Sequence, residues 1–331
     1  MSHLEEPAAT PWESDGRAPT GTVVSIGSIN ADHALFGVPD DLGGLSFADG
    51  QLRTSGGKAA NVAVFVARLG IPARLVGTVG SDDLVELALA GPRSAGVDLS
   101  AVARTYGDTG LSTVLVHGDG AKDIVLRLNA NDDPAARTVV HRAMSVPDDG
   151  VVVLDAELEP VAFAAAVSRC TADGRILVVD PSPAGRIDDD TIAAATHLTP
   201  DHHEAQQLTG EDCSTLEGAL RAARALHRRG ADVVHVKLVE GGCVTRSAEG
   251  EWHTSSSDGL AVVDTTGAGD AFAAGVAVAL LRGLSVPDVA RLAVAASDCA
   301  TEGAGSQESY PDRHELVAMY RRVRCVRLGD G

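Results

Sequence analysis

A glycine-containing turn late in the chain constrains the fold more than any other feature. Residues Asp264–Gly275 read DTTGAGDAFAAG. The apolar run Leu260–Val263 before this stretch predicts a strand, and the run Ala271–Leu281 after it predicts a helix of small residues. The sequence therefore predicts a strand, a tight turn and a helix whose first turn carries the carboxylate of Asp270.

The turn has the chemistry of a phosphate site. Gly267 and Gly269 let the backbone bend tightly and approach a ligand without Cβ contacts. Because the first N–H groups of a helix have no partner within it, we expect those of Gly267, Ala268 and Gly269 to donate to phosphate oxygens. The positive end of the helix is expected to keep Asp270 ionised, ready to accept the proton of an attacking hydroxyl. The alternative is an ordinary turn followed by an acidic first helical turn.

A second glycine motif lies about two hundred residues upstream. Residues Gly56–Asn61 read GGKAAN and open a predicted helix, Val62–Leu69. Together the two stretches resemble the two signature motifs of the ribokinase/PfkB family of carbohydrate kinases, and the resemblance extends from Thr22 to Arg324. It implies a doubly wound, mostly parallel α/β sheet with helices on both faces and a small β-sheet lid. It also implies ATP-dependent phosphorylation of a sugar hydroxymethyl group, with Asp270 as general base.

The resemblance assigns several residues to the sugar. The segment Gly27–His33 is similar to the ribokinase branch of the family, in which an Asn and an Asp hold sugar hydroxyls. The residues implied to contact the sugar are Asn30, Asp32, Gly57, Lys58, Asn61 and Glu157. Glu159 is the alternative to Glu157, and a polar strand end with an Asx turn is the alternative at Asn30.

Other residues are implied to face the nucleotide and its metal ions. Relatives usually carry Asn-x-x-Glu where this chain has Asp201 and Glu204, so Asp201 places extra negative charge near the triphosphate. Relatives also show Thr-x-Gly-x-x-Gly where this chain has Lys237–Gly242, and we expect Lys237 to contact phosphate beside Gly242. Glu204 is implied to help place magnesium, whereas Asp264 and the backbone of Thr266 are implied to bind potassium. We interpret His202 and His203 as part of a solvated helix, because adjacent helical residues point in different directions.

The rest of the chain alternates between strand and helix patterns. Buried parallel strands are predicted at 74–79, 151–154, 176–179 and 233–236, and helices at 161–172 and 216–229. A hairpin is predicted around Gly118–Gly120, with strands at 111–117 and 124–128. We expect a disordered tail over residues 1–20, one kinase domain over 21–328, and a lid formed by about 34–55 and 111–128. Family resemblance implies a homodimer through this lid.

Composition excludes some classes of partner. The 331 residues carry a net charge of −19 with a pI near 4.8, which argues against nucleic acids and anionic membranes. The five cysteines are widely spaced, so we expect a reducing cytoplasm and no zinc site. The longest apolar run, Ala271–Leu281, is too short to span a bilayer, and no signal peptide is apparent.

Ribose is the favoured acceptor because of the match at Asn30–His33, although ribokinases carry Gly-Ala-Asn where this chain has Asn129–Asn131. A nucleoside kinase of the same fold is the first alternative. It would need a slot for the base, for which Phe36 and Phe47 are the aromatic lid candidates. A non-catalytic sugar-binding relative is the second alternative, supported only by the departures at Asp201, Lys237 and Val239.

Overall fold

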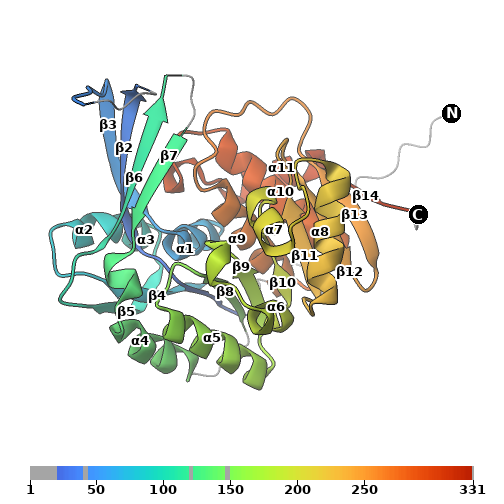
Figure 1. Cartoon of the computed structure of the whole chain (residues 1–331), viewed down its shortest axis with the longest axis horizontal. Helices are drawn as coiled ribbons and strands as arrows, with labels where there is room; N and C mark the ends of the chain where they lie inside the picture. Colours follow the sequence, from blue (N-terminus) through green and yellow to red (C-terminus); the bar gives the residue numbers. More distant parts are fainter. Residues whose placement is uncertain (1–20, 40–43, 119–121, 146–149, 330–331) are drawn as a thin grey trace.

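The computed structural model describes residues 21–39, 44–118, 122–145 and 150–329 (Figure 1). These residues form a ten-stranded sheet covered by helices and a separate four-stranded sheet. The predicted tail at 1–20 and residues 119–120 of the predicted hairpin turn lie outside the described residues. The predicted α/β architecture is confirmed.

The large sheet has the order β14-β13-β12-β11-β10-β9-β8-β1-β4-β5. Its strands are β1 (Val23–Ile26), β4 (Ala73–Val79), β5 (Asp98–Arg104), β8 (Val151–Asp155), β9 (Ile176–Asp180), β10 (His197–Leu198), β11 (Val233–Lys237), β12 (Cys243–Ser247), β13 (Gly250–Ser255) and β14 (Arg324–Arg327). The strands from β11 to β5 in this order run parallel, and β12, β13 and β14 are antiparallel. The near-continuous apolar sequences of the central strands β1, β8 and β9 reflect burial on both faces.

Helices cover both faces of this sheet. One apolar layer contains residues of α1 (Lys58–Arg68), α2 (Leu84–Ala88), α9 (Ala268–Leu281), α10 (Val286–Thr301) and α11 (Arg313–Arg322), and α3 (Ala90–Ser94) packs against α1. The other contains residues of α4 (Ala135–Met144), α5 (Pro160–Asp173), α6 (Asp189–Ala194), α7 (His202–Thr209) and α8 (Leu216–Arg228). Neighbours along a strand alternate between the layers: Val23 belongs to the first and Val24 to the second.

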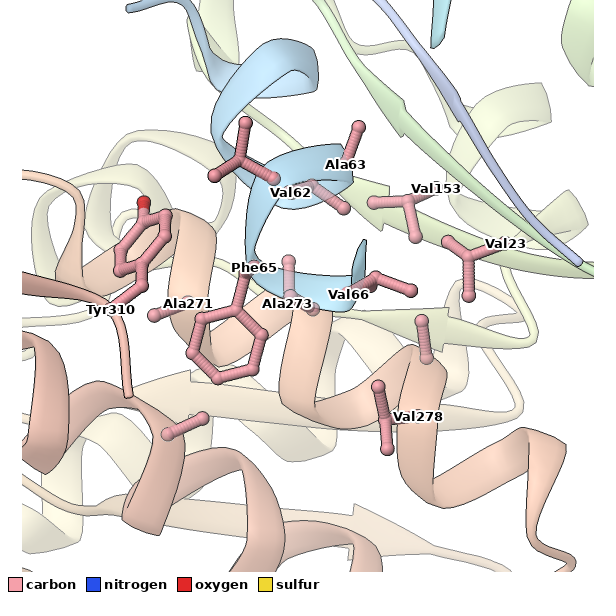
Figure 2. Close-up of a cluster of buried hydrophobic side chains, with 14 of the residues drawn as sticks. Val23, Val62, Ala63, Phe65, Val66, Val153, Ala271, Ala273, Val278 and Tyr310 are labelled. Atoms are coloured by element: carbon pink, nitrogen blue, oxygen red, sulfur yellow. The ribbon is translucent and has the colours of Figure 1, made fainter. Parts of the chain in front are cut away.

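The helix α9 is buried because its side chains are small. A Cβ on Gly275 would lie 2.8 Å from the Cα of Ala293, so α9 and α10 pack almost backbone to backbone. Figure 2 shows Ala271, Ala273 and Val278 of α9 packed with α1 and the strands. This packing fixes the N-terminus of α9 near the carboxyl end of the parallel strand β9.

The small sheet has the order β3-β2-β6-β7 and projects from one end of the molecule (Figure 1). Its strands are β2 (Asn30–Val38), β3 (Gly50–Gly56), β6 (Gly110–His117) and β7 (Lys122–Arg127). The predicted hairpin is confirmed as the antiparallel pair β6 and β7. Asn30, expected at the end of the first strand, is instead the first residue of β2, because the chain passes from one sheet to the other through residues 27–29.

The prediction of a strand at Leu260–Val263 is wrong. Both edges of β13 are already paired, and the N–H groups of Val263 and Asp264 donate to the carbonyl of Thr301 at the end of α10. The last helix, α11, ends at Arg322, and Arg324 begins β14. Among the described residues, no helix is both long and apolar enough to cross a membrane.

Candidate active site

One cavity gathers almost all the predicted site residues. It has a volume of about 750 Å³ and lies beyond the carboxyl ends of the parallel strands, facing the small sheet. The predicted residues that line it are Asn30, Asp32, Gly57, Lys58, Asn61, Glu157, Asp201, Glu204, Lys237, Gly242, Thr266, Gly267, Ala268, Gly269 and Asp270. Of the predicted set, only Asp264 lies outside this lining.

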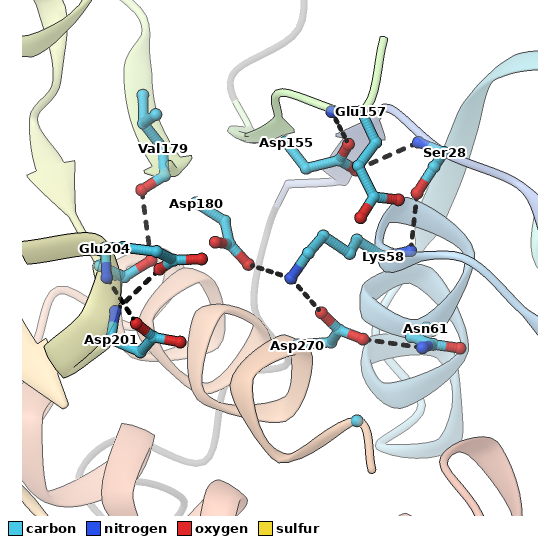
Figure 3. A network of polar contacts seen from close by, with 12 residues as sticks. Ser28, Lys58, Asn61, Asp155, Glu157, Val179, Asp180, Asp201, Glu204 and Asp270 are labelled. Carbon is cyan, nitrogen blue, oxygen red and sulfur yellow. Dashed lines mark hydrogen bonds and ion pairs between the residues drawn. The ribbon is translucent and has the colours of Figure 1, made fainter. Parts of the chain in front are cut away.

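Asp270 is buried in the first turn of α9, where it accepts hydrogen bonds from two side chains of α1 (Figure 3). Its Oδ2 accepts from Asn61 Nδ2 at 2.7 Å, and its Oδ1 lies 3.4 Å from Lys58 Nζ. Burial raises the pKa of Asp270, and Lys58 and Asn61 only partly oppose this. The expected effect of the helix N-terminus is therefore outweighed, and Asp270 is a stronger proton acceptor than an ordinary aspartate.

A second carboxylate shares the Lys58 ammonium. Lys58 Nζ lies 3.2 Å from Asp180 Oδ2 at the carboxyl end of β9 (Figure 3). Burial alone would lower the pKa of Lys58, but Asp180 and Asp270 outweigh it and raise that pKa well above its usual value. Lys58 is therefore an ammonium that links two carboxylates from different elements.

Glycine is required where the two helices begin. Gly57 precedes α1 with φ 94°, and a Cβ there would lie 2.6 Å from the carbonyl oxygen of Ser28. Gly267 precedes α9 with φ 77°, and a Cβ there would lie 2.6 Å from the Cβ of Ser306. Both φ values belong to the left-handed region that glycine adopts most readily.

The turn before α9 leaves backbone donors open. The N–H of Ala268, predicted to bind phosphate, donates to the carbonyl of Thr265 at 3.2 Å. The N–H groups of Gly267, Gly269 and Asp270 have no hydrogen-bond partner within the described part of the chain. These open donors and the helix dipole favour an anion at this end of the cavity.

Lys237 adds a positive charge to the same end. It closes β11, and its Nζ would lie 3.3 Å from a Cβ built on Gly269. Gly242 forms the nearby turn with φ 77°, and a Cβ there would lie 2.2 Å from the carbonyl oxygen of Thr254. Lys237 therefore lies beside the turn that carries the open N–H donors, and its contact with phosphate stays a prediction.

Asn30 and Asp32, which were predicted to contact the sugar, line the same cavity. Asn131 Nδ2 donates to Asn30 Oδ1 at 2.7 Å, and Asn131 Oδ1 accepts from the N–H of Ile29 at 2.9 Å, so Asn131 orients Asn30. Asp32 Oδ1 is buried and has no hydrogen-bond partner among the described residues. Burial, reinforced by Asp270 and Glu157, raises the pKa of Asp32 to about 7. The unpaired oxygen is available to a ligand hydroxyl.

The structure distinguishes Glu157 from its alternative. Glu157 lines the cavity, and its N–H donates to Asp155 Oδ1 at 2.9 Å (Figure 3). Glu159 instead caps α5 by accepting from Ala162 and pairs with Arg137 at 2.6 Å. Burial raises the pKa of Glu157, and Lys58 opposes this.

Asp201 and Glu204 form a capping box at the start of α7. Asp201 Oδ1 accepts from the N–H of Glu204, and Glu204 Oε2 accepts from the N–H of Asp201, both at 2.8 Å. Burial raises the pKa of Glu204, and Asp180 adds to this effect. The residue that departs from the family pattern, Asp201, therefore has a structural role of its own in starting this helix.

Asp264, predicted to bind potassium, is an ion-pair partner of the small sheet. Lys122 Nζ forms a short contact with Asp264 Oδ1 and donates to Thr266 Oγ1 at 2.8 Å. The N–H of Gly305 donates to Asp264 Oδ2 at 3.0 Å. Burial alone would raise the pKa of Asp264, but these donors lower it to about 2.

Sequence reasoning missed three contributors to this network: Asp180, Asn131 and Lys122. Asp180 carried a usable signal, because an aspartate directly after a buried strand falls at the ligand-binding edge of a parallel sheet. Asn131 matches the last residue of the Gly-Ala-Asn run of ribokinases, and Asn129 is the residue that departs from it. Lys122 carries no local signal, because it stands in an ordinary strand pattern.

Comparison with known proteins identifies the family. The pattern of pfkB family carbohydrate kinases matches residues 21–313. A ribokinase of Haemophilus influenzae is 29% identical over 303 residues, covering 89% of this chain and 97% of the relative. A ribokinase of Arabidopsis thaliana is 30% identical over 322 residues, covering 93% and 82%.

Solved structures agree with this assignment. Arabidopsis thaliana ribokinase, in complex with ribose and ATP, superposes with a TM-score of 0.76 at 27% identity, covering 92% of this chain and 99% of that one. A Burkholderia thailandensis nucleoside kinase in complex with inosine has the same TM-score of 0.76 at 20% identity, which shows a shared fold. The chain therefore belongs to the pfkB family of carbohydrate kinases and is a phosphotransferase.

Proposed function

We propose that this protein phosphorylates the hydroxymethyl group of D-ribose, using ATP, to give ribose 5-phosphate. The observation that carries the proposal is the placement of Asp270 between open backbone donors on one side and Asn30 and Asp32 on the other. The ribokinases among its relatives, one of them solved with ribose and ATP, support the choice of substrates.

Sugar binding uses the buried end of the cavity. The unpaired Oδ1 of Asp32 and the oriented amide of Asn30 bind ribose hydroxyls, with Glu157 beside them. The small sheet closes over the sugar as a lid, because side chains of β6 and β7 already line the cavity. Closure excludes water, which would otherwise compete for the phosphoryl group.

Phosphoryl transfer occurs at the N-terminus of α9. The ribose hydroxyl oxygen attacks the γ-phosphorus of ATP while the bond from that phosphorus to the bridging oxygen breaks and ADP leaves. Asp270 takes the hydroxyl proton. The N–H groups of Gly267 and Gly269, together with Lys237, stabilise the charge on the transferred group.

The carboxylates fit magnesium. Asp180 Oδ1 is buried and unpaired among the described residues. Glu204 lies close enough to Asp180 for the negative charge of Asp180 to raise the pKa of Glu204. Carboxylate oxygens and their bound waters are the ligands that magnesium prefers. We propose that Glu204 and Asp180 hold this ion through water, and that Asp201 contributes to the same region. When bound, magnesium neutralises charge on the phosphates.

The predicted potassium site does not fit in the same way. The side chain of Asp264, which was expected to face the ion, already contacts the Lys122 ammonium, and the ammonium also contacts the hydroxyl of Thr266, whose backbone was the implied ligand. A second monovalent cation at Asp264 would lie beside a like charge. No step of the proposed reaction is assigned to potassium.

A nucleoside acceptor receives weaker support. Phe36 and Phe47, the predicted candidates for a base slot, are 39% and 79% exposed, and neither lines the cavity. Val114, Ile124 and Leu126 of the small sheet do line it and could contact a base. A nucleoside panel therefore belongs in the same experiment.

We also propose that the outer face of the small sheet forms a homodimer. Val125 is 62% exposed and lies on the face opposite Ile124 and Leu126, which line the cavity, whereas Phe36 and Leu52 share the cavity face. Light scattering of the eluting protein should give twice the mass of one chain, and Val125→Glu should shift it to the monomer. A monomeric wild-type protein would contradict this proposal.

The test of function is ADP release with MgATP over a panel of ribose, other sugars and nucleosides. We expect turnover with ribose and a loss of about 10²–10⁴-fold in kcat for Asp270→Asn. The matched control is Asp190→Asn, which removes the same charge from the exposed first turn of α6 and should leave kcat unchanged. Turnover with nucleosides alone would favour the nucleoside kinase, and turnover with none of the panel would favour the sugar-binding relative. Full turnover by Asp270→Asn would refute the base assignment.

A further inference from the structure

The Asp264 carboxylate, which family resemblance implied as a potassium ligand, is already paired with a charge from the protein. Lys122 Nζ contacts Asp264 Oδ1 and Thr266 Oγ1. Thr266 itself donates to Asp264 Oδ1 from its N–H at 2.9 Å and from its hydroxyl at 2.7 Å. With Gly305 on the other oxygen, both oxygens of Asp264 accept hydrogen bonds from the protein.

The ammonium comes from a different part of the fold than the oxygens. Lys122 is the first residue of β7 and pairs with Val116, next to the turn of the β6–β7 hairpin. Asp264 and Thr266 belong to the loop that enters the Gly267 turn, and Figure 1 shows this hairpin end beside that loop. One ion pair therefore joins the small sheet directly to the segment that carries the open N–H donors.

The ion pair acts on the site indirectly. Lys122 and Asp264 lie outside the cavity lining, whereas Thr266 and Gly267 belong to it. The side chains of Lys122 and Asp264 are 23% and 21% exposed, so water only partly screens their attraction. Lys122 is thus a positioning residue for the turn, and it does not touch the reacting atoms.

We propose that the Lys122 ammonium is the resident monovalent cation of the Asp264 site and that it links closure of the small sheet to the ordering of the Gly267 turn. The kinetic part of this inference rests on the proposed function. In this arrangement the protein supplies its own cation when the hairpin closes, so turnover does not depend on potassium.

The kinetic test compares the wild-type protein and Lys122→Gln in KCl and in choline chloride of equal ionic strength, with MgATP and ribose. We expect equal wild-type turnover in the two salts. We expect Lys122→Gln to lose about tenfold in kcat in choline chloride, less than the loss of a direct oxyanion donor, and to regain activity in KCl. The matched control is Arg127→Gln at the other end of β7, whose Nε contacts only Asn129 Oδ1 at 2.7 Å and whose turnover should not depend on the salt.

A second measurement is independent of turnover. Hydrogen exchange of the amides of residues 260–268, without substrates, should be the same in both salts for wild type. In Lys122→Gln it should be faster in choline chloride and slowed by KCl. This result would hold even if the protein phosphorylates another acceptor, so failure of the inference and failure of the proposed function can be told apart.

Three outcomes would overturn the inference. The first is potassium-specific activation or amide protection in the wild-type protein, which would mean that potassium displaces Lys122. The second is a Lys122→Gln protein that is fully active and fully protected in choline chloride. The third is a folded Lys122→Gln protein whose losses potassium does not reverse. If the variant does not fold, the wild-type comparison still decides between the first outcome and the proposal.

Discussion

The two glycine turns that begin α1 and α9 share a positive glycine φ but differ in ψ and in their surroundings. Each places a glycine of positive φ at the helix N-cap without a side-chain cap, with ψ 137° at Gly57 and 0° at Gly267. At α1 the first N–H, that of Lys58, donates to Ser28 Oγ at 2.9 Å. At α9 the N–H groups of Gly269 and Asp270 have no partner among the described residues.

This difference fits a packing role for one turn and the anion-binding role proposed for the other. The turn at Gly57 packs directly on the backbone of residues 28–30, so it fixes the strand end that holds Asn30. The turn at Gly267 packs mainly on the side chains of Ser306 and Tyr310 and leaves its donors open. Glycines of positive φ at the two helix starts therefore fit the proposed positioning of Asn30 in one place and the proposed anion binding in the other.

The strongest way to break this comparison is to add a methyl group to each turn. Gly267→Ala should lower kcat about a hundredfold or more, because the donors move away from the transferred phosphoryl group. Gly57→Ala should instead destabilise the fold by on the order of 3 kcal/mol, because a Cβ there would lie 2.6 Å and 2.7 Å from backbone atoms of Ser28 and Asn30. Kinetics and urea denaturation measure the two effects.

Gly283→Ala is the control for backbone conformation alone. Its φ is 63°, and a Cβ there would meet nothing within 4 Å. It should cost about 1 kcal/mol and leave kcat unchanged. Equal effects of Gly57→Ala and Gly267→Ala on kcat would show that the two turns do not differ in role.

Lys58 connects the two turns, so its loss should be costly. Lys58→Met leaves Asp180 and Asp270 buried without their shared cation, and we expect destabilisation of about 3–5 kcal/mol at pH 8. The loss should shrink as the pH falls, because protonation removes the uncompensated charge. Lys237→Met is the control, since it removes the same charge from the same cavity without breaking an ion pair in the described part of the chain. Similar destabilisation by both variants would contradict a special role for the Lys58 bridge.

Asp32 provides a pH-dependent test on the sugar side. Its pKa in the folded protein is about 7, above its usual value of 3.8. Between these values the folded protein keeps a proton that the unfolded chain has lost, so this contribution to stability is complete below about pH 4 and decreases as the pH rises through 7. We expect Asp32→Asn to be more stable than wild type by about 4 kcal/mol at pH 8 and no more stable at pH 4.

The same titration should be visible in sugar binding. Ionised Asp32 accepts hydrogen bonds better than the neutral acid, so the KM for ribose should fall as the pH rises through 7. In Asp32→Asn this pH dependence should disappear. A stability difference between the two proteins that does not change with pH would rule out the elevated pKa as its cause.

Much of this fold could be predicted because its signals are local. The parallel strands are short apolar runs, and the two glycine turns carry their conformation in the residues themselves. Leu260–Val263 has the same local pattern but is not a strand, because both edges of the preceding strand, β13, are already paired. Strand propensity describes a preference of the backbone, and pairing depends on where other strands lie.

The missed site residues depend on contacts between distant parts of the chain. Lys122 and Asp264 are 142 residues apart, so no periodicity or spacing relates them. Asp201 and Glu204 stand three residues apart, which is the spacing of a capping box. The family pattern implies a different role for the same two residues, beside the nucleotide. The family resemblance predicted which residues line the cavity. The hydrogen bonds and ion pairs that hold them in place could be read only from the structure.

The smallest predicted effect separates these two roles of Asp201. Asp201→Asn keeps a good N-cap, so stability should change by less than about 0.5 kcal/mol, while loss of a negative charge near the phosphates should lower the KM for ATP about twofold. Asp201→Ala should cost about 1 kcal/mol and lower that KM similarly. Asp188→Ala is the control, because it removes the N-cap of α6, whose side chain accepts from Thr191 at 2.8 Å, away from the cavity. If Asp201→Asn raises the KM for ATP, Asp201 binds the nucleotide's metal as well as capping α7. The α7 end of the cavity would then act directly on the phosphates, as the Gly267 turn is proposed to do.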